Sequence, residues 1–114
     1  MALLGTVFKL KASHEGFGRP FHEHEFKIVV VFEGEIENGA VAGLDFHQAK
    51  AMVIEVLAGL EGKRLNEFFE PASVENLAVY ILRKLKKLPI KSIRVWEAED
   101  RFAEVFKKEI GKSF

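Results

Sequence analysis

Hydrophobic and polar residues alternate along two stretches near the start of the chain and two near its end. The alternation runs over residues 5–14 and 22–36, and it returns over residues 90–98 and 101–107. Side chains with a period of two lie on opposite faces of a strand, so the pattern predicts four strands, each with one apolar face. Asn38-Gly39 is a turn signal that ends the second strand.

Between the two pairs of strands, the hydrophobic period changes to that of a helix. Asp45 followed by Gln48 is a capping-box pattern that opens the first predicted helix, which closes near Gly59 or Gly62. A serine at position 73 is the predicted N-cap of the second helix, which a proline at position 89 stops. The order is β-β-α-α-β-β. It predicts an α+β fold in which a four-stranded antiparallel sheet carries both helices on one face.

The opposite face of the predicted sheet has apolar residues of its own. Val7, Val29, Val31 and Val95 lie opposite the histidine-bearing side of the strands or along their edges. A single chain would then expose apolar surface and unpaired strand edges, for which oligomerisation is one remedy. The other interpretation is that these valines are ordinary surface residues.

Length and charge narrow the class of protein. With 114 residues, we expect a single domain, 1–114, with one core. Lys plus Arg and Asp plus Glu are 17 each, so net charge favours neither nucleic acid nor a membrane surface as a partner. No apolar run approaches the ~20 residues of a membrane span, and we expect a cytoplasmic protein. The absence of cysteine excludes disulfides, thiolate metal ligands and a thiol nucleophile.

Three of the four histidines fall within residues 14–24. His14 continues the apolar face of the first strand, and His22 and His24 begin that of the second. If residues 15–21 fold the strands back antiparallel, the three imidazoles converge, as a three-histidine metal site with an open position requires. A single histidine at a strand end is usually a surface residue with an ordinary hydrogen bond. Three on one face favour a metal site, and neutral imidazole is the commonest protein ligand for zinc and its neighbours.

Six short motifs, in order along nearly the whole chain, resemble those of the 6-pyruvoyltetrahydropterin synthase and 6-carboxytetrahydropterin synthase family. They are A-S-H at 12–14, H-E-H at 22–24, G-L-D-F at 43–46, L-E-G-K-R-L-N at 60–66, P-A-S-V-E-N-L-A at 71–78 and V-W-E-A at 95–98. The resemblance implies the tunnelling fold (T-fold), in which trimeric barrels stack as a homohexamer with pterin sites between subunits. It also implies a zinc-dependent lyase acting on the side chain of a dihydropterin such as 7,8-dihydroneopterin triphosphate.

The resemblance also implies roles for single residues. The histidines at 14, 22 and 24 match the family's three zinc ligands. Glu97 matches the glutamate that anchors the pterin ring. Chemistry supports this role, since a carboxylate can accept two parallel hydrogen bonds from ring N3–H and the 2-amino group. Without the resemblance, Glu97 would be read as a surface glutamate. Ser73 and Glu75 match the threonine and glutamate of P-T-x-E-N, which makes Ser73 a candidate substrate contact as well as a helix cap.

The chain departs from the family at its acid–base groups. The family's synthases carry a cysteine base shortly before H-x-H, where this chain has Phe17 and Gly18. The family's L-D-H supplies an aspartate and a histidine that relay protons, and the corresponding pair here is Glu61-Gly62. The thiol base and the histidine relay are therefore both missing.

Three explanations of these departures stay open. In the first, one of the carboxylates Glu15, Glu23 and Glu61 has taken over proton transfer, although strand parity points Glu23 away from the metal. In the second, the protein cleaves the pterin side chain to another product. In the third, it binds a pterin without turnover.

Two further readings concern other residues. The spacing G-x5-H-x-H at 16–24 also opens a cupin metal motif, but that motif needs a glutamate where this chain has Ile28 and Val29, and a cupin has strands where this chain has helices. We therefore exclude a cupin. Arg19, Lys63 and Arg64 are candidate contacts for a phosphate tail, but a solvated charged face is the interpretation that the sequence favours for each of them.

Overall fold

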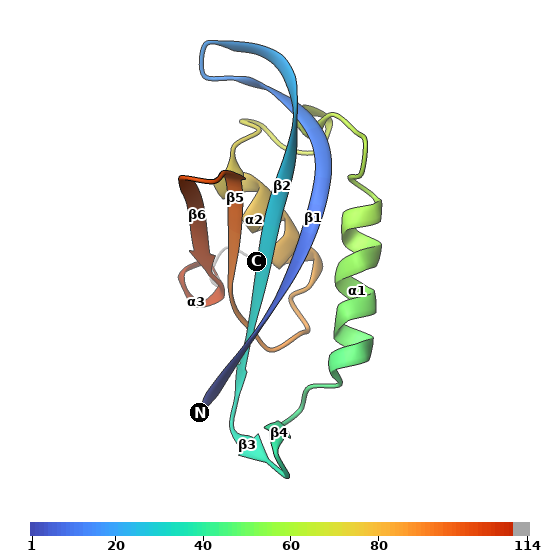
Figure 1. Ribbon diagram of the computed structural model, residues 1–114, viewed down its shortest axis with the longest axis vertical. Coiled ribbons are helices and arrows are strands. Elements are labelled where there is room, and N and C mark those ends of the chain that lie inside the picture. Colours follow the sequence, from blue (N-terminus) through green and yellow to red (C-terminus); the bar gives the residue numbers. More distant parts are fainter. Residues whose placement is uncertain (111–114) are drawn as a thin grey trace.

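The fold is a four-stranded antiparallel sheet in the order β1-β2-β5-β6, with the helices inserted between its two hairpins (Figure 1). A computed structural model describes residues 1–110. Its main elements are β1 (Ala2–Gly16), β2 (Arg19–Gly34), α1 (Phe46–Ala58), α2 (Val74–Lys84), β5 (Ile90–Ala98) and β6 (Arg101–Phe106). The predicted β-β-α-α-β-β order is confirmed. Within residues 1–110, none of the helices is long and apolar enough to cross a membrane.

Four short elements were not predicted. They are β3 (Ile36–Glu37), β4 (Ala40–Val41), the 3₁₀ turn η1 (Leu65–Glu67) and α3 (Lys107–Ile110). The first two pair across the predicted Asn38-Gly39 turn, where both residues have positive φ. Each of the four is too short to carry a hydrophobic period of its own, which is why the pattern did not indicate them.

The β1–β2 hairpin is longer than predicted. We expected a loop over residues 15–21, but the strands continue to Gly16 and from Arg19, and these two residues pair. Only Phe17 and Gly18 form the turn, with φ of 55° and 77°. Positive φ at both central residues matches the right-handed twist of the strands, so a two-residue turn can join them. The hairpin therefore extends the sheet beyond the histidines.

Side-chain caps fix the starts of both main helices. The Oδ1 atom of Asp45 accepts a hydrogen bond from the backbone N–H of Gln48 at 3.1 Å, and Ser73 Oγ accepts one from that of Asn76 at 3.1 Å. The predicted N-caps are thus confirmed. The first helix ends at its cap residue Gly59, and α2 ends at Lys84, before the proline that follows it.

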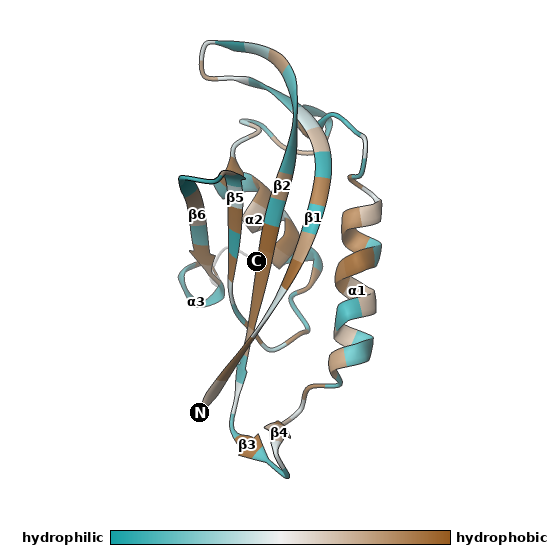
Figure 2. Cartoon of the chain, in the orientation of Figure 1, coloured by the Kyte–Doolittle hydropathy of each residue, from teal (hydrophilic) through white to brown (hydrophobic). Residues whose placement is uncertain are grey.

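The core lies between one face of the sheet and both helices. Phe8, Ile28 and Val95 lie side by side across β1, β2 and β5, and all three are buried. They pack with the buried residues of α1 and α2, which are Ala49, Val53, Leu57, Leu77, Ala78, Ile81 and Leu82. Figure 2 shows the alternation of hydrophobic and hydrophilic residues along β1 and β5. Burying each large aliphatic or aromatic side chain contributes about 1.5–3 kcal/mol, so this one face supplies most of the stabilisation.

The other face of the sheet is partly apolar, as expected. Val7 is 58% exposed, and Val29 and Val31 beside it are half-buried. The expectation for Val95 was wrong: it is fully buried, because its partner Ile28 belongs to the core face. Within residues 1–110 the two main helices pack on the core face of the sheet (Figure 1), so neither covers this second face.

Candidate metal centre and its cavity

Three imidazoles converge near the turn of the β1–β2 hairpin. His14 pairs with His22 across the two strands, and His24 lies opposite Ala12 on the same face. The ring centroids of His14–His22, His14–His24 and His22–His24 are 4.7, 5.1 and 4.4 Å apart. This is the convergence that strand parity predicted.

The hydrogen bonds of two of these rings hold them in one tautomer. His14 Nδ1 lies 2.6 Å from the carbonyl oxygen of Ala72, and His22 Nδ1 lies 2.7 Å from that of Pro20. A carbonyl only accepts, so Nδ1 must carry the proton and Nε2 must carry the lone pair. A metal-binding histidine uses the same arrangement, with its second nitrogen donating to a carbonyl or carboxylate.

The Nε2 atoms of all three histidines are buried and have no hydrogen-bond partner. Leaving such an atom unpaired costs about 1–3 kcal/mol, so three together indicate a missing ligand. The residues fit a metal ion, because three imidazole nitrogens directed into one space are the donor set of an open three-histidine centre.

Glu97 joins this group from β5. Its Oε1 lies 3.2 Å from His24 Nε2 and 3.6 Å from His14 Nε2. One ligand atom from each of the three histidines and Glu97 lies within 4.8 Å of the others, so the four side chains could hold a metal together. Glu97 reaches this place because β5 lies next to β2 and has an irregularity between Trp96 and Ala98.

The charge state of His24 suits metal binding. Burial lowers the pKa of its imidazole below the usual range; the Glu97 carboxylate opposes this, and the neighbouring imidazoles and Arg19 reinforce it. A lowered pKa keeps the ring neutral at neutral pH, and only the neutral ring can donate a lone pair to a metal.

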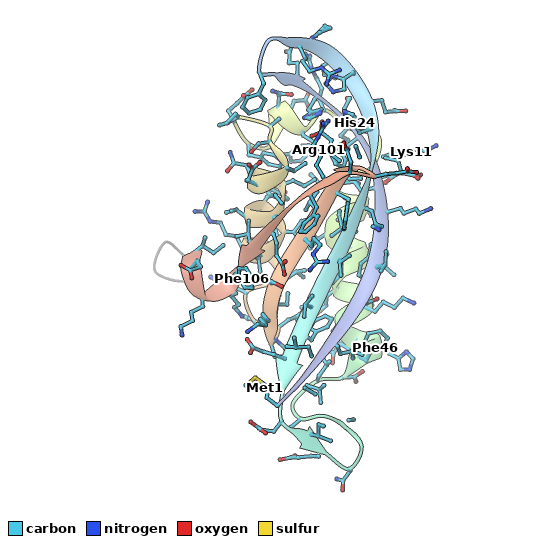
Figure 3. The ribbon with its side chains drawn as sticks, turned by 60° about the vertical axis from the view of Figure 1, so that its left-hand side comes forward. Met1, Lys11, His24, Phe46, Arg101 and Phe106 are labelled. Atoms are coloured by element: carbon cyan, nitrogen blue, oxygen red, sulfur yellow. The ribbon has the colours of Figure 1, made fainter. Side chains whose placement is uncertain are left out.

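His14 and His22 open into a cavity of about 710 Å³. The predicted site residues His14, His22, Ser73 and Glu97 line it, as does the candidate phosphate contact Arg19, whereas His24 is not part of the lining. The charged lining of the cavity further includes Glu75 at the start of α2 and a second arginine, Arg101. Figure 3 shows Arg101 at the β5–β6 turn and His24 in the same region of the molecule.

Sequence reasoning did not single out Arg101 and left Glu75 without a role. Arg101 Nε lies 3.9 Å from Glu97 Oε2, four residues earlier across the β5–β6 turn. A signal for Arg101 was present, because a residue just past a two-residue turn returns to the same end of the sheet as the residues before it. The motif P-A-S-V-E-N matched Glu75 to a family glutamate but gave it no role, because its place in the cavity depends on how α2 packs against the sheet.

The three candidate proton-transfer carboxylates do not line the cavity. Glu61 Oε2 accepts a hydrogen bond from the backbone N–H of Lys11 at 3.1 Å, on the outer edge of β1. Glu15 forms an ion pair with Arg64 at 3.0 Å, and Glu23 is exposed. Within one chain, the structure therefore does not bring them to the histidines, and their role in catalysis stays a prediction.

A family comparison agrees with this geometry. The family described as 6-pyruvoyl tetrahydropterin synthase matches residues 8–108. The chain belongs to this family. The match takes in all three histidines, the second helix and Glu97, so the resemblance noted in the six motifs is confirmed.

Two relatives of this chain carry different names. A protein of Archaeoglobus fulgidus named "Putative 6-carboxy-5,6,7,8-tetrahydropterin synthase" is 39% identical over 110 residues, which cover 90% of this chain and 94% of that protein. The dihydroneopterin monophosphate aldolase of Pyrococcus furiosus is 34% identical over 84 residues, which cover 69% of this chain and 72% of the aldolase. Both names describe enzymes of pterin metabolism.

Solved structures of the same family share the fold. The 6-pyruvoyl tetrahydropterin synthase of Caenorhabditis elegans superposes with a TM-score of 0.79 at 18% identity, covering 92% of this chain and 94% of that one. The Plasmodium falciparum enzyme superposes with a TM-score of 0.68 at 17% identity, covering 91% and 96%. The predicted tunnelling fold is thereby confirmed.

Proposed function

We propose that the chain is a zinc-dependent lyase that acts on the side chain of a phosphorylated dihydropterin such as 7,8-dihydroneopterin triphosphate. The observation that carries the proposal is the set of three buried, unpartnered Nε2 atoms beside a cavity that also holds carboxylates and arginines. When bound by His14, His22 and His24, Zn²⁺ supplies a Lewis acid that lowers the pKa of a side-chain hydroxyl or polarises a keto oxygen.

The two carboxylates of the cavity suit opposite ends of a pterin. The ring donates two hydrogen bonds from N3–H and its 2-amino group, and the reacting side chain extends from the opposite edge of the ring. Glu97 lies beside the histidine nitrogens, so we place it at the side-chain end of the ligand. That leaves Glu75, at the start of α2, as the acceptor for the ring edge. This arrangement replaces the ring-anchor role that the resemblance implied for Glu97.

Ser73 is suited to the same ligand. Its Oγ already accepts a hydrogen bond from the backbone of Asn76, and it lines the cavity. A hydroxyl that accepts one hydrogen bond still has its own proton to donate, so Ser73 can donate to a ring nitrogen or carbonyl while it caps α2.

Glu97 is also placed to move a proton. Its Oε1 is within hydrogen-bond reach of the position where a group bound near His24 would sit. A positioned carboxylate can take a proton from a side-chain hydroxyl and return it to carbon, and a general base of this kind contributes about 10²- to 10⁴-fold. Glu97 would thus supply in this chain what the cysteine supplies in the family's synthases.

A second reaction of the same site is carbon–carbon cleavage, favoured by the absence of cysteine from the chain. Elimination of triphosphate starts with removal of a proton from carbon. Cleavage starts instead from the hydroxyl proton on C2′: Glu97 takes it, the C1′–C2′ bond breaks, its electron pair moves into the conjugated ring, and C1′ is then protonated. A hydroxyl is the more acidic group, so a carboxylate suffices as the base. The name of the Pyrococcus furiosus relative, an aldolase, supports this candidate.

Product analysis distinguishes the two reactions. The zinc-loaded protein is incubated with the triphosphate and with the monophosphate of 7,8-dihydroneopterin, and the products are identified by mass spectrometry. Elimination releases inorganic triphosphate from the first substrate, or inorganic phosphate from the second, and leaves a three-carbon side chain. Cleavage releases a two-carbon aldehyde phosphate and leaves a hydroxymethyl group on the ring. Recovery of both substrates unchanged would contradict both reactions. The remaining explanation would then be a protein that binds a pterin without turnover.

The arginines of the cavity are proposed to hold the phosphate, because a guanidinium binds phosphate oxygens in a bidentate manner. Replacing Arg19 with glutamine should weaken binding of neopterin monophosphate about tenfold or more, since a hydrogen bond to a charged group contributes about 1.5–3 kcal/mol. Binding of unphosphorylated neopterin should change little. Calorimetric titration of both ligands measures the difference, and Lys87→Gln, with the same change of charge away from the cavity, is the control. Equal weakening of the affinity for both ligands would show that Arg19 does not bind the phosphate.

We further propose that the protein assembles as a homohexamer of two trimers with pterin sites between subunits. The uncovered, partly apolar face of the sheet and the position of β1 and β6 as its outer strands support association. Light scattering should give a mass of about 77 kDa, six times the chain mass of 12.9 kDa. A mass equal to that of one chain at micromolar concentration would contradict the proposal.

A further inference from the structure

The turn that joins β1 and β2 holds an aromatic residue where the backbone disfavours one. Phe17 has φ of 55°, in the left-handed region, and its side chain is 72% exposed. A bulky residue in this region is strained, and burial, which usually offsets such strain, is absent here. The fold of one chain therefore gives no reason for phenylalanine at this position.

The chain contains a second turn of the same geometry that shows the usual solution. Asn38 and Gly39 have φ of 52° and 80°, and Phe17 and Gly18 have φ of 55° and 77°. Asn-Gly is the preferred pair for a two-residue turn with positive φ at both central positions, because asparagine tolerates the left-handed region. Phenylalanine thus stands where the same chain elsewhere uses asparagine.

The position of Phe17 gives a reason for phenylalanine in this turn. Phe17 lines the cavity, together with Gly16 before it and Arg19 after it. Its aromatic neighbour on the same hairpin, Phe21, instead stacks against the Arg64 guanidinium at 4.3 Å and is not part of the cavity lining. Only one of the two exposed aromatic side chains of this hairpin therefore faces the space that a ligand would fill.

From these observations we infer that Phe17 is a substrate-binding residue that stacks on the planar ring of the ligand and covers the open side of the cavity. The inference rests on the proposed function, because it takes the ligand to be a flat heteroaromatic ring. Exposed aromatic groups stack on such rings without needing a hydrogen bond, and the contact removes both faces from water. The strained turn is retained because it directs the ring of Phe17 at the ligand.

Phe17→Asn separates this role from a structural one, because stability and affinity should change in opposite directions. Relief of strain should raise the melting temperature by about 2–5 °C. Loss of stacking should weaken binding of neopterin, followed by its fluorescence, about tenfold. Phe17→Trp should restore the affinity, and Phe21→Asn, on the same hairpin but outside the cavity, should leave it unchanged.

Three results would overturn the inference. Unchanged neopterin affinity in Phe17→Asn would show that the ring does not contact the ligand. A lower melting temperature would show that the ring packs within the fold. A smaller mass in light scattering would show that it holds subunits together. Failure of the wild-type protein itself to bind neopterin would overturn the proposed function as well, so the two ideas fail in distinguishable ways.

Discussion

Replacing His24 with alanine is expected to lower zinc affinity by more than about 100-fold, because even the loss of an outer-shell partner of a metal ligand costs about 10- to 100-fold. The variant removes one of three convergent Nε2 donors and leaves two, which cannot complete a three-histidine centre. Elemental analysis after dialysis against a weak chelator should find one zinc per chain in the wild type and almost none in His24→Ala. Turnover should fall with the metal.

The fourth histidine provides the control. His47 lies exposed in α1 and is not part of the group that could hold a metal, so His47→Ala should retain one zinc per chain. Thermal unfolding should show that both variants are folded. Equal zinc in wild type and His24→Ala would mean that the metal is bound elsewhere or that His14 and His22 suffice with Glu97.

Glu97→Gln is expected to reduce kcat by about 10²- to 10⁴-fold while the dissociation constant for the pterin changes by only a few-fold. The amide keeps the shape of the side chain but cannot accept a proton, and in our account the ring edge binds to Glu75. Zinc content should remain at one per chain, because the three imidazoles are enough to hold the ion. Single-turnover kinetics and calorimetry measure the two quantities separately.

The same variant tests the other two roles of Glu97. If affinity falls and kcat is kept, Glu97 anchors the ring as the family resemblance implied, and Glu75→Gln should then have little effect on affinity. If zinc content falls, Glu97 is a fourth metal ligand, as its 3.2 Å distance from His24 Nε2 allows.

Much of the fold could be predicted because each strand and helix buries one face. The alternation around Ile28 and the helical spacing around Val53 are both local patterns, and both residues are fully buried. The burial of Val95 could not be predicted in the same way. It depends on β5 pairing with β2, a contact between segments more than sixty residues apart that no local pattern specifies.

The site, like the fold, contains some features that local patterns predict and others that depend on long-range contacts. The convergence of the histidines follows from the parity of two strands joined by one turn, so sequence alone predicted it. The place of Glu97 beside them depends on long-range strand order and on the irregularity after Trp96. Glu61 was singled out by resemblance, but its carboxylate binds the backbone N–H of Lys11 on a strand edge that would otherwise lack a partner. Position in a motif did not determine where that side chain points.

Removal and return of zinc shows whether the proposed lyase activity depends on the metal. The protein is stripped with a chelator until elemental analysis finds less than about 0.05 zinc per chain, and product formation from 7,8-dihydroneopterin monophosphate and triphosphate is followed before and after zinc is restored. We predict that the stripped protein forms no product and that activity returns in proportion to zinc, saturating at one ion per chain. Full activity in the stripped protein would contradict the proposal that the lyase reaction depends on zinc.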